Sequence, residues 1–174
     1  MSKQSQLREY QTSILARLEN AKKAGAESPA GYLGVIIGGK NVLVNLQEIS
    51  ETLPILEIQR VPLVKPWFLG VANVRGVLYA INDMAQLLES TFTSISSNAR
   101  LLLISDSVAS NVAFLVDKLI GLRKLEEMKL TDILIEDDIC LKNQTYQDDE
   151  NKVWYLLDCD KLVRSKEFTT PYAT

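Results

Sequence analysis

Two apolar runs of strand length meet at Gly76, and this junction restricts the fold more than any other stretch of the chain. The first run lies between Gly70 and Gly76 and the second follows Gly76, so each has the length of a strand rather than of an average helix. Gly76 predicts a bend or bulge, because glycine adopts such a backbone without a side-chain clash. The two-residue period of a strand divides the first run into two faces, one with Val71, Asn73 and Arg75 and the other with Ala72 and Val74.

Residues at the ends of these runs are candidates for special roles. Gly70 and Gly76 bracket the first run. Arg75 stands beside Gly76 in a mostly apolar stretch, so it needs either a buried partner or a binding role. Asp83 and Gln86 have the spacing of a capping box, which predicts a short helix directly after the second run.

Strands of similar length are expected along the rest of the chain. They cover residues 33–37, 42–46, 54–61, 100–105, 111–117, 119–125, 139–147 and 153–158. Gly38 and Gly39 predict a hairpin turn between the first two strands, and the polar residues 91–98 predict a loop between two halves. Asp158 is placed to cap a last helix. Many short strands with tight turns and few helices predict an all-β chain built as two small barrels.

The first 30 residues differ from this pattern. Residues 3–24 predict a helix with one apolar stripe, and Gly25 predicts its end. The stripe consists of Leu7, Tyr10, Ile14, Leu18 and Ala21. Two interpretations are equally supported: the helix packs on its own domain, or it binds another protein or a second copy of the chain.

Composition excludes several classes of function. The 174 residues are 47% hydrophobic and 24% charged, which is typical of one globular domain. The absence of histidine removes imidazole catalysis, imidazole metal ligation and a phosphohistidine relay, and no glycine-rich phosphate loop is present. Cys140 and Cys159 lack metal or redox spacing and are expected to be reduced thiols. No catalytic residue, metal or cofactor is therefore expected.

Hydropathy and charge bear on membranes and nucleic acids. The apolar stretches are far shorter than the roughly 20 residues that span a bilayer, and residues 1–11 are polar, so a cytoplasmic protein without direct membrane insertion is expected. Residues 126–150 carry nine acidic residues against two lysines, a local charge of −7. This segment argues against nucleic-acid binding and is either solvated loop surface or an acidic docking rim.

Three segments resemble the CheW-like adaptor domains. The run G-V-A-N-V-R-G at residues 70–76, with Asp83 seven residues later, resembles the family's G-V-x-N-x-R-G … D-L signature. Residues 111–121 resemble the family's strand and turn around a V-D pair, and residues 154–162 its closing strand and helix. The resemblance covers residues 31–166 and is closest to the PilI type, the adaptor of twitching-motility chemosensory systems. The chain departs from the family pattern at Ala80, Asn82 and Met84.

The resemblance implies a fold and a function. The fold would be two five-stranded, SH3-like barrels over residues 31–90 and 98–158, with a C-terminal helix over 158–166, a tail over 167–174 and residues 1–30 as an added helix and connector. The function would be that of a non-enzymatic adaptor, which couples the cytoplasmic tip of a chemoreceptor to the regulatory domain of a CheA-type histidine kinase. A competing hypothesis is an oligomeric structural module that self-associates through its N-terminal helix without binding a kinase.

The resemblance also assigns roles to particular residues. The family's conserved glutamate and the arginine of its N-x-R-G motif correspond to Glu51 and Arg75, which are expected to form a buried or half-buried ion pair beside the receptor groove. Glu48 is a competing match, but the 24-residue spacing favours Glu51. The motif residues Gly70, Asn73, Gly76 and Asp83 would shape the bend, and the second-barrel residues Asp117, Lys118, Gly121 and Arg123 would face either water or the kinase.

Overall fold

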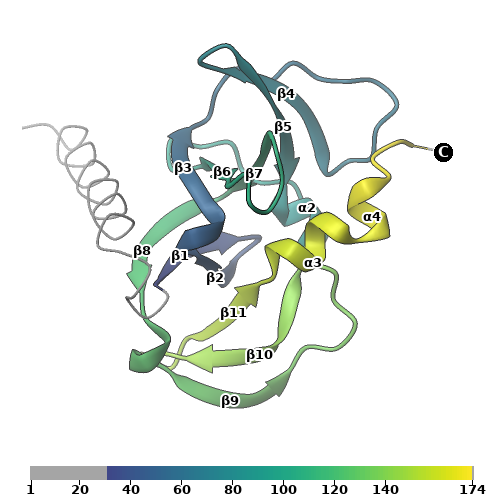
Figure 1. Ribbon diagram of the computed structural model, residues 1–174. Helices are drawn as coiled ribbons and strands as arrows, with labels where there is room; N and C mark the ends of the chain where they lie inside the picture. Colours follow the sequence, from purple (N-terminus) through teal and green to yellow (C-terminus); the bar gives the residue numbers. More distant parts are fainter. Residues whose placement is uncertain (1–30, 174) are drawn as a thin grey trace, which may run out of the picture.

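The protein is built from two β-sheets that lie against each other, as the computed structural model of residues 31–173 shows (Figure 1). The helix expected over residues 3–24 lies outside the described residues. The first sheet has six strands in the order β8-β1-β2-β11-β10-β9, and the second has five in the order β3-β6-β7-β5-β4. The all-β fold class with few short helices is thereby confirmed, although the first sheet has one strand more than expected.

The first sheet combines strands from both ends of the described chain. Its members are β8 (Lys118–Arg123), β1 (Tyr32–Ile37), β2 (Lys40–Asn45), β11 (Val153–Leu157), β10 (Leu141–Gln147) and β9 (Lys129–Leu134). β1 and β2 form the hairpin expected at Gly38 and Gly39. The parallel pairing of β2 with β11 joins this hairpin to the C-terminal strands.

The second sheet takes the middle of the chain. Its members are β3 (Ile49–Pro54), β6 (Arg100–Ile104), β7 (Val112–Val116), β5 (Val77–Asp83) and β4 (Phe68–Val74). β4 and β5 are the two runs that meet at Gly76, and they pair in antiparallel fashion. β5 also pairs with β7 in parallel, which brings the two central segments together.

The allocation of strands differs from the expected division into residues 31–90 and 98–158. β1 and β2 belong with β8 to β11, while β6 and β7 join β3, β4 and β5. The reason is that hydrophobic periodicity identifies strands but carries no information about their partners. A strand expected over residues 54–61 is also wrong, because the strand is β3, which ends at Pro54.

Three hydrophobic clusters hold the sheets. The largest lies between them, where β1 and β2 pack against β6, β7 and the short helix α2 (Met84–Glu89). A second cluster covers the other face of the second sheet, and a third covers the other face of the first. All five residues of β6 are buried, because the strand contributes alternate side chains to two clusters.

Trp154 is the largest side chain of the third cluster and depends on a close approach to backbone. Its ring lies over Gly34, where an added Cβ atom would stand 3.0 Å from two ring carbons. The indole nitrogen donates a hydrogen bond of 2.8 Å to the Asp148 carboxylate, and the Arg123 guanidinium lies 5.5 Å from the ring centroid. The buried indole is thus satisfied at its polar end and covered by a cation.

The short helices begin as the sequence predicts, with one difference. Asp83 caps α2 by accepting hydrogen bonds from the Ala85 and Gln86 amides, and Asp158 caps α3 (Cys159–Arg164). The Asp83 amide donates to the Trp67 carbonyl, so the return bond of a capping box is replaced by a long-range one. A last helix, α4 (Lys166–Thr169), and two single 3-10 turns, η1 (Leu46–Glu48) and η2 (Leu125–Glu127), complete the set.

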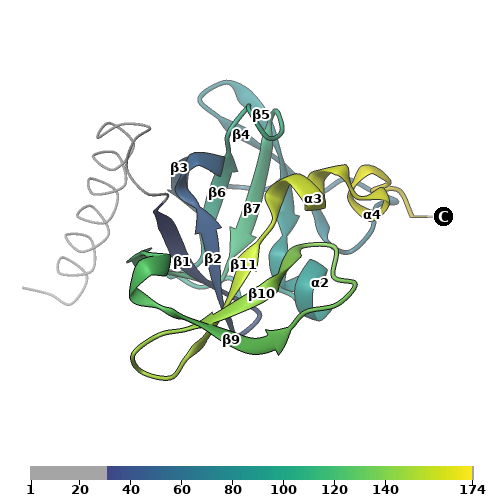
Figure 2. The ribbon, with the colours of Figure 1, turned by 60° about the horizontal axis from the view of Figure 1, so that its bottom comes forward.

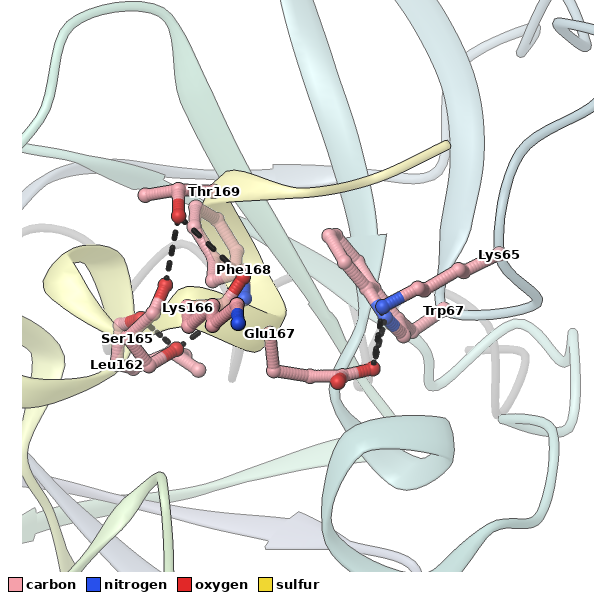
Figure 3. Close-up of polar contacts among 8 residues, drawn as sticks. All are labelled: Lys65, Trp67, Leu162, Ser165, Lys166, Glu167, Phe168 and Thr169. Carbon is pink, nitrogen blue, oxygen red and sulfur yellow. Dashed lines mark hydrogen bonds and ion pairs between the residues drawn. The ribbon is translucent and has the colours of Figure 1, made fainter. Parts of the chain in front are cut away.

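The C-terminal helices connect the two sheets (Figures 1 and 3). Phe168 of α4 stacks on Trp67 at 5.3 Å between ring centroids and meets Phe114 of β7 edge-on. The Glu167 carboxylate accepts a hydrogen bond of 3.2 Å from the Lys65 ammonium and one of 3.3 Å from the Trp67 indole. Figure 3 shows the three side chains meeting at this point. These contacts of Phe168 and Glu167 hold the segment that leads into β4.

Gly70 is a position where the fold requires glycine. Its φ is +146°, and an added Cβ atom would stand 2.1 Å from the Gln59 carbonyl oxygen. Gln59 and Val71 exchange two backbone hydrogen bonds at this crossing, of 2.8 and 2.9 Å. The segment after β3 is therefore held against β4 only because Gly70 has no side chain.

We expect Gly70→Ala to lower the free energy of unfolding by about 2–4 kcal/mol, since backbone must move. The matched control is Gly39→Ala, which also has a positive φ (+85°) but no atom within 4 Å of the added Cβ. It should cost about 1–2 kcal/mol. Urea unfolding measures both, and equal losses would contradict the close approach at Gly70.

Candidate functional site

The turn between β4 and β5 is the centre of the candidate site. Val74 pairs with Val77, so Arg75 and Gly76 form a two-residue loop, and both have positive φ (49° and 88°). This is the backbone of a type I′ hairpin turn, which favours glycine at the second position. The Asn73 side-chain oxygen accepts a 2.7 Å hydrogen bond from the Gly76 amide and so fixes the loop. The expected bend at Gly76 is present.

Arg75 and Glu51 form the expected ion pair. The guanidinium donates two hydrogen bonds to the carboxylate, one to each oxygen, of which the first is 3.1 Å long. The hydrogen bond to Glu51 raises the pKa of Arg75. Glu51 lies on β3 and Arg75 directly follows β4, and these are the two edge strands of the second sheet. The pair therefore bridges the opposite edges of that sheet.

The expectation that this pair is buried or half-buried is wrong for the arginine. The Arg75 side chain is 68% exposed and that of Glu51 is 36% exposed. The physical reason is the position of Arg75 at the tip of a hairpin, outside the packed face to which Ala72 and Val74 contribute. An exposed ion pair contributes little to folding, because water and salt screen it. It leaves a planar, ordered guanidinium on the surface.

Apolar side chains adjoin the ion pair. Val77 and Leu78 open β5 directly after the turn, and both are exposed. Leu78 lies opposite the exposed Asn73 in the hairpin register. Arginine is enriched at the centres of protein interfaces, and the exposed aliphatic side chains beside it add apolar area that a partner can cover.

Glu48, the competing partner for Arg75, lies elsewhere. It ends the 3-10 turn η1, and its carboxylate lies beside the Cys159 thiol at the start of α3. The structure therefore pairs Arg75 with Glu51 and not with Glu48.

The remaining motif residues have structural positions. Gly70 allows the Gln59 backbone to approach β4 closely, as described above. Asp83 is buried and accepts hydrogen bonds from α2 and from the Thr93 amide and hydroxyl, at 2.9 and 2.6 Å. Sequence analysis missed Thr93, because its partner is ten residues away and no local pattern marks the contact.

The four second-barrel candidates lie in or next to β8, at an edge of the first sheet. Asp117 accepts a 2.6 Å hydrogen bond from the Gly38 amide and thereby holds the β1–β2 turn. Gly121 has a positive φ (+139°) and pairs with Gly34, and Arg123 covers Trp154. Among these four residues, Lys118 is exposed to solvent. The structure thus places this group on a different sheet from Glu51 and Arg75.

Over residues 31–173, no cluster of three or more histidine, cysteine or carboxylate side chains is arranged to hold a metal ion. No helix in that range combines the length and hydropathy needed to cross a membrane.

Comparison with known proteins shows the family and supports the fold. The family model of the CheW-like domain matches residues 31–167. The chain belongs to the CheW-like domain family. It is 28% identical over 103 residues to the protein PilI of Pseudomonas aeruginosa, and the match covers 59% of this chain and 57% of that relative. The crystal structure of the CheW scaffolding protein from Thermoanaerobacter tengcongensis shares the fold with a TM-score of 0.66, at 12% identity, over 80% of this chain and 95% of that one.

The two thiols of this CheW-like domain supply a pH-dependent test of the core. Cys140 and Cys159 are fully buried in the cluster between the sheets. Burial, and to a lesser degree Asp138, raises the pKa of Cys140 to about 12. Burial and the Glu48 carboxylate raise the pKa of Cys159 as well.

The sign of the pH effect follows from these shifts. In the unfolded chain the thiols ionise above about pH 8.5, whereas in the folded chain they stay protonated. The stabilisation from the protonated thiols is thus complete below about pH 8.5. It is lost as the pH rises toward the thiol pKa values of the folded chain. We expect the free energy of unfolding to fall by about 1.4 kcal/mol per pH unit for each thiol. Cys140→Ala should show a shallower slope in urea titrations between about pH 8.5 and 10.5, and an unchanged slope would contradict the buried, protonated thiol.

Proposed function

We propose that this CheW-like protein is a non-enzymatic, cytoplasmic adaptor that couples a chemoreceptor to a CheA-type histidine kinase. Membership of the family supports an adaptor role, and the absence of histidine from the whole chain supports a role without imidazole chemistry. The observation that carries the proposal is the exposed Glu51–Arg75 pair. It is ordered and bidentate, it contributes little to folding, and it lies beside exposed apolar side chains, so its position is best explained by a partner.

The partner at this site is the cytoplasmic tip of the chemoreceptor. The guanidinium keeps donor capacity beyond its two bonds to Glu51, because it carries five N–H groups. Carboxylate or backbone oxygens of a helical hairpin would accept these bonds, while Val77 and Leu78 would cover its apolar residues. Glu51 orients the arginine before binding, which reduces the entropy lost on association.

The kinase binds the other sheet in this proposal. Lys118 is the exposed cation at the start of β8, and Arg123 is held over Trp154 at its end. Gly121 lies between the two cations in β8, and Asp117, directly before Lys118, holds the β1–β2 turn beside them. The two partners therefore occupy separate sheets and bind at the same time, as an adaptor requires.

The signalling pathway is the one that controls twitching motility by type IV pili. The similarity to PilI supports this assignment, although the chain matches only 57% of the length of that relative.

A crossed binding experiment tests the proposal. We expect Arg75→Ala to weaken binding of an immobilised receptor tip by about tenfold or more, as loss of a central interface arginine does, and to leave binding of the kinase regulatory domain unchanged. Lys118→Glu should weaken kinase binding and spare receptor binding, because reversing a rim charge acts on one partner only. Thermal melts should match the wild type for both, since both side chains are exposed.

The matched control is Arg164→Ala, which removes a more exposed ion pair, with Asp160 on α3. It should affect neither partner. Equal loss of both partners in Arg75→Ala, or no loss in either cation variant, would contradict the assignment of two separate surfaces.

A further inference from the structure

The edge strand β9 exposes apolar side chains that no described part of the chain covers. Leu130, Ile133 and Leu134 are 60%, 47% and 63% exposed, and we refer to them as the β9 patch. β9 pairs only with β10 among the described strands, so its other backbone edge is open (Figure 2). An apolar edge strand of this kind promotes association unless another segment covers it.

The β9 patch has a strongly acidic rim. Glu126, Glu127, Asp132 and Glu136 lie within or next to β9 in the chain, and all four are exposed. They belong to the segment of residues 126–150, whose local charge is −7. A segment that covers the β9 patch should therefore be apolar on one face and basic beside it.

The N-terminal segment of the same chain has this composition. Residues 3–24 contain five basic and two acidic residues, a net charge of +3. At about 100° per residue, Arg17 and Lys22 flank the apolar stripe that includes Ile14, whereas Glu9 and Glu19 lie away from it. The stripe would meet the β9 patch, and the flanking cations would meet its rim.

The first described residues are connected to the β9 patch through packed side chains. Gly31 precedes Tyr32, which packs in the cluster on the outer face of the first sheet with Leu125, Met128 and Tyr146. Tyr146 in turn lies opposite Leu130 of β9 in the strand register. Half-buried side chains thus lead from the first described residues to the β9 patch, and only six residues of sequence, 25–30, separate the predicted helix from Gly31.

We infer that residues 3–24 of this chain dock on its own β9 patch as an amphipathic helix. The docked segment covers the open edge of β9 and neutralises part of the acidic rim. It keeps that edge from pairing with other chains, and it leaves the Glu51–Arg75 pair and Lys118 free for partners.

Cross-linking in the full chain tests this inference. The double variant Ile14→Cys with Ile133→Cys is treated with a short bismaleimide. The native thiols do not compete, because Cys140 and Cys159 are fully buried. The control pair is Ile14→Cys with Leu78→Cys, whose second site is also apolar and is more exposed than Ile133 but lies on the second sheet. We expect an intramolecular product from the first pair at a yield at least about fivefold above the control.

Every other result overturns the inference. Equal yields from both pairs would show a segment without a fixed dock. Dimeric products would make a second copy the occupant, and no product would leave the β9 patch uncovered by this segment.

Amide hydrogen exchange gives a second readout that does not depend on cross-linker geometry. Ile14→Asp, on the stripe, should speed exchange in Lys129–Leu134 at least about tenfold, whereas Asn20→Asp, off the stripe, should not. The same rates in both variants would also overturn docking.

Discussion

Burial between the two sheets is the interaction on which the rest of this CheW-like structure depends. β1 and β2 supply five fully buried aliphatic side chains to it, and β6, β7 and α2 cover them from the other sheet. Because β6 is buried on both faces, its side chains also anchor the cluster on the far side of the second sheet. Neither sheet could keep its position if this shared core were lost, since each would expose one apolar face.

This arrangement leaves the edges and turns available for function. The second sheet has β3 and β4 as its edges, and the ion pair between Glu51 and Arg75 connects them at the surface. Two consecutive residues with positive φ carry Arg75 outward, and Asn73 holds this turn by a hydrogen bond to the Gly76 amide. The core thus supplies stability, and the hairpin presents a charged group whose orientation is set before any partner arrives.

Sequence patterns predicted the local elements better than their assembly. The two-residue period at residues 71–75 correctly separated the face of Ala72 and Val74 from that of Asn73 and Arg75. The family resemblance, with its 24-residue spacing, correctly predicted that Glu51 pairs with Arg75. Burial of that pair was not predictable, because it depends on which way a hairpin tip points in the assembled sheet. The halves to which β1 and β6 belong were also predicted wrongly, since pairing with a distant strand, as of β1 with β8 and of β6 with β3, leaves no trace in local periodicity. β9 was missed because its apolar residues, Leu130, Ile133 and Leu134, do not alternate regularly with polar ones, so they give no strand pattern.

The central claim is that one chain holds a receptor and a kinase together, and co-sedimentation tests it most directly. A CheA-type kinase is mixed with membrane vesicles that carry the chemoreceptor, with and without this protein. The account predicts that the kinase sediments with the vesicles only when the protein is present, and that the sedimented amount rises with added protein until the receptor sites are filled. Kinase that sediments equally without the protein, or that stays in solution at every protein concentration, would contradict the account.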